Sequence, residues 1–296
     1  MEEFKDILHL PVFVGSMSSK SERWSLMKKR LDDAGFMNYQ MWKFPDGRIT
    51  QEVNDAWDYL NLDVPLQRFH FSWGGTLAGT IGYIGILKHA IDRKIPHFVV
   101  FEDDIQFHPN FTEVGSWLYE LTKQHYPDWD LIYLGCQPEY KPWADITVGQ
   151  VYGGYSLLYT LDGAKKVYDK LVEHIHKGDL NCFDMIMYDW QYELCVGGSN
   201  YLKWYTWSTR WRDYAKVNPD VPSHGYWDNT TDPFGWSWKN DGIVFPDYNI
   251  VSTLDCGCID PRKHDSFRPE IKSLYCSHDK EYLLDLKRKA GYEIFD

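Results

Sequence analysis

A chain of 296 residues with 44% hydrophobic residues is long enough to bury a substantial core, in one large domain or two small ones. The 31 Lys and Arg residues against 43 Asp and Glu residues give a net charge of −12, which disfavours binding to nucleic-acid phosphates or to an anionic membrane surface. The first residues lack the basic start and apolar run of a secretion signal, and no segment approaches the roughly 20 apolar residues of a membrane span, so we expect a soluble, cytoplasmic protein.

The first predicted unit is a strand followed by a helix. Residues 11–16, PVFVGS, form a short apolar run that is typical of a strand. Ser19 and Glu22 have the spacing of a capping box, and apolar residues at helical spacing follow until Gly35. The sequence therefore predicts a strand and a helix that ends at this glycine.

Further units follow in the same alternation. Residues 44–47, Phe-Pro-Asp-Gly, have the chemistry of a turn. An apolar stripe predicts a helix from about 76 to 93, and the run 98–101, Phe-Val-Val-Phe, predicts a buried strand after it. Further strands are predicted at 130–135 and before residue 160.

The last clear element of this half is a helix at 161–176, whose apolar residues share one face. Strands that alternate with helices favour an α/β fold with a mainly parallel sheet. In such a sheet, ligands bind in the crevice outside the carboxyl ends of the strands.

Three consecutive carboxylates, Glu102, Asp103 and Asp104, directly follow the strand predicted at 98–101. Like charges at the end of a buried strand are costly unless a positive group lies beside them. Hard oxygen ligands suit Mg²⁺ or Mn²⁺, which one or two carboxylates can hold together with diphosphate oxygens. The pattern therefore indicates a divalent-metal site, and a solvated acidic turn is the alternative.

A set of sequence motifs in a fixed order gives the first two thirds of the chain a family resemblance. They are the strand and Arg-Trp helix at 12–31, Asp46-Gly47, the glycines at 79 and 82, residues 101–104, residues 130–135, and the glycines at 153–154 with residues 163–166. Over roughly residues 10 to 190 the chain resembles glycosyltransferase family 25, which contains lipopolysaccharide-type and collagen-type sugar transferases. The resemblance implies a GT-A type fold, a nucleotide-sugar donor with UDP foremost, a metal-binding Asp-x-Asp-like element and inversion at the anomeric carbon.

The resemblance assigns roles to individual residues. Glu102 and Asp104 match the metal-binding element. The sequence departs from the family pattern where a Ser-His pair is replaced by Ile86 and Leu87, so the nearby His89 becomes the candidate histidine. The first strand also ends in Gly-Ser instead of Asn-Leu. The candidate donor-binding residues are Gly15, Ser16, Arg23, Asp46, His89 and Asp103.

Inverting transfer needs a general base for the acceptor hydroxyl, and a carboxylate is the usual choice. The segment 180–191, LNCFDMIMYDWQ, offers Asp184 and Asp189. An acidic residue of the family resembles Asp184 more closely, so Asp184 is the preferred catalytic base and Asp189 the second candidate. Either one could instead cap a helix.

The region from 201 to 296 is predicted to be an acceptor-side region packed on the core formed by residues 1–200. Its aromatic side chains favour either a sugar-stacking platform over the crevice or the filling of a loop-rich core. The tryptophans concerned are Trp204, Trp207, Trp211, Trp227, Trp236 and Trp238. Arg210 and Arg212 are the candidate phosphate contacts if the acceptor is DNA.

The cysteines are too sparse for a disulfide scaffold. One cluster near the C-terminus has zinc-ligand chemistry, but its spacing matches no common zinc motif, which favours incidental cysteines in a loop. Its members are Cys256, Cys258, His264, Cys276 and His278.

These features together predict a metal-dependent inverting glycosyltransferase. Its cofactors are Mn²⁺ or Mg²⁺ and a nucleotide-sugar, and its acceptor is a hydroxyl of a glycan, glycolipid or protein. The alternatives are a viral or phage-type enzyme that glycosylates a modified base in DNA, which the net charge of −12 disfavours, and a non-catalytic carbohydrate-binding protein.

Overall fold

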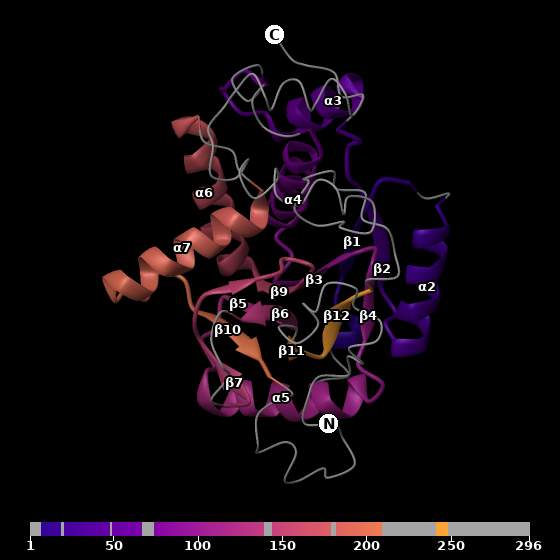
Figure 1. Ribbon diagram of the computed structural model, residues 1–296, viewed down its shortest axis with the longest axis vertical. Coiled ribbons are helices and arrows are strands. Elements are labelled where there is room, and N and C mark those ends of the chain that lie inside the picture. The colour runs from indigo at the N-terminus through magenta and orange to yellow at the C-terminus, as the bar shows by residue number, and fades with distance from the viewer. Residues whose placement is uncertain are drawn as a thin grey trace, which may run out of the picture.

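A seven-stranded sheet with the order β2-β1-β3-β9-β5-β10-β7 forms the centre of the protein, as a computed structural model shows (Figure 1). The structure describes residues 7–18, 21–47, 49–66, 74–138, 144–178, 182–208 and 241–247. The strands of this sheet are β1 (Val12–Ser16), β2 (Tyr39–Lys43), β3 (His97–Glu102), β5 (Leu131–Tyr133), β7 (Ile146–Thr147), β9 (Ser156–Thr160) and β10 (Trp204–Trp207).

Most strands of this sheet run in one direction. β1 pairs in parallel with β2 and β3, and β10 pairs in parallel with β5. β9 lies between β3 and β5 and is antiparallel to both, so β5 and β10 run in the same direction as β3. β7 is antiparallel to β10 at the edge. The predicted α/β fold with a mainly parallel sheet is confirmed.

Helices cover both faces of the sheet (Figure 1). Buried side chains of α3, α4, α6 and α7 belong to the hydrophobic core on one face, and those of α2 and α5 to the core on the other. The bounds are α2 (Glu22–Ala34), α3 (Thr50–Leu60), α4 (Gly74–Asp92), α5 (Phe111–His125), α6 (Leu161–Lys177) and α7 (Phe183–Gly197). No helix in the described part of the chain is both long and apolar enough to cross a bilayer.

Strand β3 is buried on both faces, as its apolar run predicts. Phe98 and Val100 pack into one core, and Val99 and Phe101 into the other. Because side chains alternate across a strand, an uninterrupted apolar run is what a central strand between two helical layers requires.

Helix α2 has its N-cap two residues later than the predicted capping box places it. Ser21, and not Ser19, is the N-cap, and its hydroxyl accepts a hydrogen bond of 3.0 Å from the backbone N–H of Trp24. Ser19 lies outside the described residues. Gly35 ends the helix as predicted, in the left-handed conformation with φ 88° that a residue without Cβ adopts at little cost.

Two smaller sheets attach the later part of the chain to the core. β12 (Val244–Pro246) pairs antiparallel with β4 (Ile105–Phe107), directly after the acidic turn. β11 (Asp241–Gly242) pairs with β6 (Gly135–Pro138), which also pairs with β8 (Val151–Tyr152). The described residues beyond 200 therefore contribute strands to the same domain as the first 200.

The two tryptophans of β10 are core residues. Trp204 is 3% exposed and its Nε1 donates to the carbonyl of Gly149, while Trp207 is fully buried and its Nε1 donates to Thr122 Oγ1 at 2.9 Å. A sugar cannot stack on rings that lie inside the core, so the platform interpretation is wrong for these two residues.

The other aromatic and basic residues proposed for the acceptor side lie outside the described residues, as does the Cys/His cluster. They are Arg210, Trp211, Arg212, Trp227, Trp236, Trp238, Cys256, Cys258, His264, Cys276 and His278.

The buried His108, between β4 and α5, gives a pH prediction. Its Nδ1 accepts a hydrogen bond from the N–H of Asn110, and burial lowers the pKa of His108 from 6.5 to about 4. Between these values the unfolded chain binds a proton that the folded chain does not, so His108 costs stability as the pH falls, by up to about 1.4 kcal/mol per pH unit.

We therefore expect the free energy of unfolding of the unchanged protein to fall more steeply between pH 6.5 and 4 than that of His108→Asn. The asparagine keeps an acceptor near the Asn110 N–H and does not titrate. Urea denaturation at several pH values measures the difference in slope, and equal slopes would contradict the prediction.

Candidate functional site

The acidic residues lie where two parallel strands end side by side. Gly15 of β1 is in register with Glu102, the last residue of β3. Asp103 and Asp104 form the turn from β3 into β4. The cluster therefore lies at the carboxyl edge of the sheet, the edge at which ligands bind in α/β proteins.

Ser16 and Arg23 reach this turn from β1 and from the first turns of α2. The Ser16 hydroxyl donates to Asp103 Oδ2 at 2.5 Å, and Arg23 Nη2 forms an ion pair with Asp103 and donates to Asp104 Oδ2 at 2.8 Å. Burial raises the pKa of Asp103 to about 6, although the Arg23 charge works against this shift. The structure thus brings three candidate donor-binding residues together with Asp104.

Glu102 points toward α4. Its Oε1 accepts a hydrogen bond of 2.7 Å from the hydroxyl of Tyr83. Burial raises the pKa of Glu102, and the nearby charges of Asp104 and Asp184 raise it further. Glu102 therefore lies within electrostatic reach of both the acidic turn and the predicted base.

The donor set fits a divalent ion that is shared with a ligand. Both oxygens of Asp103 are engaged by Ser16 and Arg23, whereas Glu102 and Asp104 each keep one oxygen that no described residue hydrogen-bonds. Within the described ranges, no three His, Cys, Asp or Glu side chains form a cluster that could hold a metal by itself. Mg²⁺ typically uses one or two carboxylates and completes its shell with phosphate oxygens and water, so two carboxylates suit a site that needs the diphosphate.

Asp184 lies in the first turn of α7. Its Oδ1 accepts a hydrogen bond of 2.6 Å from the backbone N–H of Gly154, and burial raises its pKa while this hydrogen bond opposes the shift. Asp189 is exposed and five residues further along the helix, roughly 140° around its axis. The structure therefore brings Asp184, and not Asp189, toward Glu102.

Gly154 permits a close approach that a side chain would block. A Cβ at this position would lie 2.6 Å from Asp184 Oδ1 and 2.6 Å from the ring of Phe183. The glycine thus lets the start of α7 sit directly against the backbone before β9.

Gly15 and His89 belong to aromatic packing. A Cβ on Gly15 would lie 2.5 Å from the Phe44 ring. The His89 ring packs against Phe13 and Trp42 with centroid separations of 5.5 and 5.1 Å, and burial lowers its pKa. Both residues therefore have packing contacts, and their role in donor binding stays a prediction.

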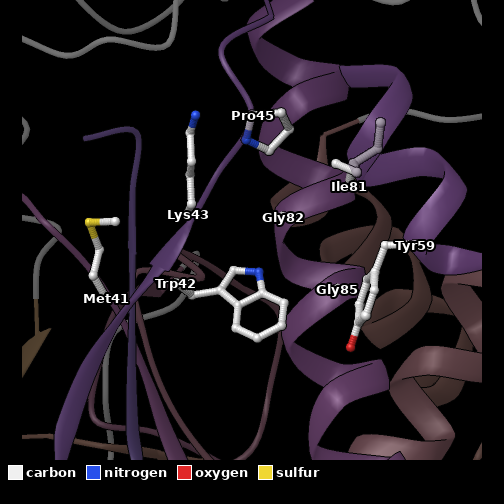
Figure 2. A pocket seen from close by; sticks show the side chains of 9 residues that line it. Met41, Trp42, Lys43, Pro45, Tyr59, Ile81, Gly82 and Gly85 are labelled. Atoms are coloured by element: carbon white, nitrogen blue, oxygen red, sulfur yellow. The ribbon is translucent and has the colours of Figure 1, made fainter. Parts of the chain in front are cut away.

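Asp46 lies in the loop between β2 and α3, where its backbone N–H donates to Glu52 Oε2 at 3.0 Å. A cavity of ≈ 310 Å³ opens beside this loop, between β2, α3 and α4. Figure 2 shows the Trp42 indole extending across it from β2 toward α4, with Pro45 at one side. The residue before Asp46, Pro45, therefore lines a cavity that Trp42 and Tyr59 also line.

Two curated mammalian proteins resemble this chain in sequence. "Inactive glycosyltransferase 25 family member 3" of Mus musculus is 30% identical over 170 residues, which are 53% of this chain and 28% of the mouse protein. "Probable inactive glycosyltransferase 25 family member 3" of Rattus norvegicus is 33% identical over 102 residues, which are 31% of this chain and 18% of the rat protein. The resemblance to glycosyltransferase family 25 is confirmed. The chain spans less than a third of the length of these relatives.

No family model matches the chain. Among solved structures, a glycosyltransferase involved in the glycosylation of the major capsid of PBCV-1 is 11% identical, with a TM-score of 0.30 over 54% of this chain and 65% of that one. Mouse xyloside xylosyltransferase 1 is 10% identical, with a TM-score of 0.33 over 74% of this chain and 93% of that one.

Proposed function

We propose that the protein is a metal-dependent, inverting glycosyltransferase that moves a sugar from a nucleotide-sugar, with UDP the expected nucleotide, to a hydroxyl of a glycan, glycolipid or protein. The observation that carries this proposal is the convergence of Glu102 and Asp104 with Asp184 at one edge of the sheet. Sequence similarity to glycosyltransferase 25 family members supports the same class of reaction.

Glu102 and Asp104 would hold Mn²⁺ or Mg²⁺ together with the donor diphosphate, and the ion would neutralise charge on the departing phosphate. Arg23 adds a guanidinium beside Asp103 and Asp104. Such a fork binds phosphate oxygens well, so Arg23 is the residue we expect to contact the diphosphate.

Asp184 has the properties of a general base for the acceptor. Gly154 fixes one oxygen, and no described residue hydrogen-bonds the other, Oδ2, which leaves it available to a hydroxyl. Its raised pKa also makes it a stronger base than an exposed aspartate, because proton transfer is most efficient when the pKa lies nearer the working pH.

A second candidate function is carbohydrate binding without transfer. The names of the mouse and rat relatives, both of which carry the word "inactive", favour the absence of transfer in this candidate. The combination of Glu102, Asp104 and Asp184 argues for catalysis instead, because binding alone requires neither a metal-compatible pair nor a base.

A donor screen tests the proposal. UDP-, GDP- and CMP-sugars are incubated with the protein with and without Mn²⁺, and release of the nucleotide is measured. We expect hydrolysis of a UDP-sugar that requires the metal. Donor binding without turnover, with every sugar and with an acceptor mixture of glycans present, would support the carbohydrate-binding function.

A further inference from the structure

We propose that Tyr83 is a positioning residue that holds Glu102 and Asp184 in a fixed relation to each other. The inference rests on the proposed function, because it assigns Tyr83 a task between the carboxylate on the metal side and the general base. Neither the acidic motif nor the family motifs point to this tyrosine.

The first evidence is a continuous set of hydrogen bonds. The Tyr83 hydroxyl lies 2.7 Å from Glu102 Oε1 and 2.9 Å from the carbonyl oxygen of Gly154. The N–H of the same glycine donates to Asp184 Oδ1 at 2.6 Å. One phenol and one glycine therefore connect the end of β3 with the start of α7.

The second evidence is the packing of the ring. Tyr83 is 5% exposed and stacks on Phe183, the residue before Asp184, with a centroid distance of 4.2 Å and an interplanar angle of 9°. The ring of Phe44 also packs against it, at 5.3 Å in an edge-to-face arrangement. Because the ring is enclosed, its hydroxyl has little freedom to leave Glu102 and Gly154.

The geometry also couples the two sides of the site. A phenol carries one proton, so the Tyr83 hydroxyl donates either to Glu102 or to the Gly154 carbonyl at any moment. When the hydroxyl donates to Glu102 it does not donate to the Gly154 carbonyl, and the reverse. The hydrogen bonding of Glu102 therefore influences Gly154, whose N–H orients Asp184. A small displacement of a catalytic group can cost about 10²-fold in rate, which sets the scale of the effect.

Tyr83→Phe removes only the hydroxyl and keeps both ring contacts. We expect kcat for hydrolysis of the UDP-sugar to fall about 10- to 100-fold while the donor KM changes less than about twofold, because the donor contacts stay in place. Hydrogen exchange of the Gly154 amide, followed by NMR, should become at least about 10-fold faster, because the adjoining Gly154 carbonyl loses its hydrogen bond from Tyr83 and the segment opens more easily.

Tyr159→Phe is the matched control. Tyr159 is also fully buried and stacks on Phe98, but its hydroxyl has no hydrogen-bond partner among the described residues. Tyr159→Phe removes a hydroxyl oxygen from the same core but leaves the hydrogen bonds between Tyr83, Glu102 and Gly154 in place. We therefore expect kcat and Gly154 exchange to stay within about twofold of the unchanged protein.

The outcomes separate this inference from the proposed function. Where turnover is measurable, kcat decides: an unchanged kcat in Tyr83→Phe, or an equal fall in Tyr159→Phe, overturns the positioning role. If the unchanged protein hydrolyses none of the donors, the proposed function fails, and Gly154 exchange decides. Faster exchange in Tyr83→Phe alone then supports the positioning contact, and equal exchange in both variants overturns it.

Discussion

Asp184→Asn should lower kcat for sugar transfer by about 10² to 10⁴ while the donor KM changes little, because general-base catalysis contributes on that order. Asparagine retains an oxygen that can accept the hydrogen bond from the Gly154 N–H, so the start of α7 should keep its position. What it loses is the basic Oδ2 that no described residue engages. Initial rates at varied donor and acceptor concentrations measure both constants.

Asp189→Asn is the control for the same helix. Asp189 is exposed and faces away from the direction of Asp184, so its replacement should leave kcat within about twofold of the unchanged protein. Loss of donor binding in Asp184→Asn would assign Asp184 to the nucleotide or metal. A large loss of kcat in Asp189→Asn alone would make Asp189 the base.

The strands that carry the acidic turn can be predicted from the sequence, because a short uninterrupted apolar run is a local signal for a buried strand. β1 and β3 are short apolar runs, and runs of that kind fit a strand with helices on both faces. The position and direction of β9 are not predictable in this way. Its apolar residues are equally compatible with parallel pairing, and only the connection through the rest of the chain makes it antiparallel to both β3 and β5.

The location of the aromatic residues after position 200 cannot be predicted from the local sequence either. Trp204 and Trp207 have the composition of a sugar-binding surface, but they lie in β10, inside the sheet between β5 and β7. Aromatic side chains carry both a large apolar surface and a polar N–H, so the sequence alone does not distinguish a stacking platform from a core. The hydrogen bonds of both indoles to buried acceptors explain how the core accommodates them.

The residues of the candidate site also differ in whether the sequence alone indicates them. The acidic run is visible in the sequence because adjacent residues bear the charge, and family resemblance indicates Asp184. Tyr83 has no such signal, because its partners Glu102 and Gly154 lie 19 and 71 residues away along the chain. Only the fold brings α4, β3 and the segment before β9 to the same point.

Asp104→Asn should abolish transfer and leave the fold intact. The substitution removes the charge of one of the two carboxylates available to a divalent ion, and metal affinity depends on the number of charged ligands. Arg23 keeps its ion pair with Asp103, so the acidic turn retains a cationic partner. We expect the melting temperature to change by no more than about 2–4 °C, the shift that corresponds to about 1 kcal/mol in a domain of ordinary size.

Metal removal should have the same effect as this substitution. Because the described residues offer the ion only two carboxylates, Mn²⁺ should bind weakly to the protein alone and more tightly when UDP is present. Titration calorimetry with Mn²⁺, with and without UDP, measures this dependence in the unchanged protein, in Asp104→Asn and in the control Asp33→Asn, an exposed residue of α2 that pairs with Lys29. The control should bind and turn over normally, whereas undiminished turnover in Asp104→Asn, or full activity in excess EDTA, would show that transfer does not depend on a metal at this turn.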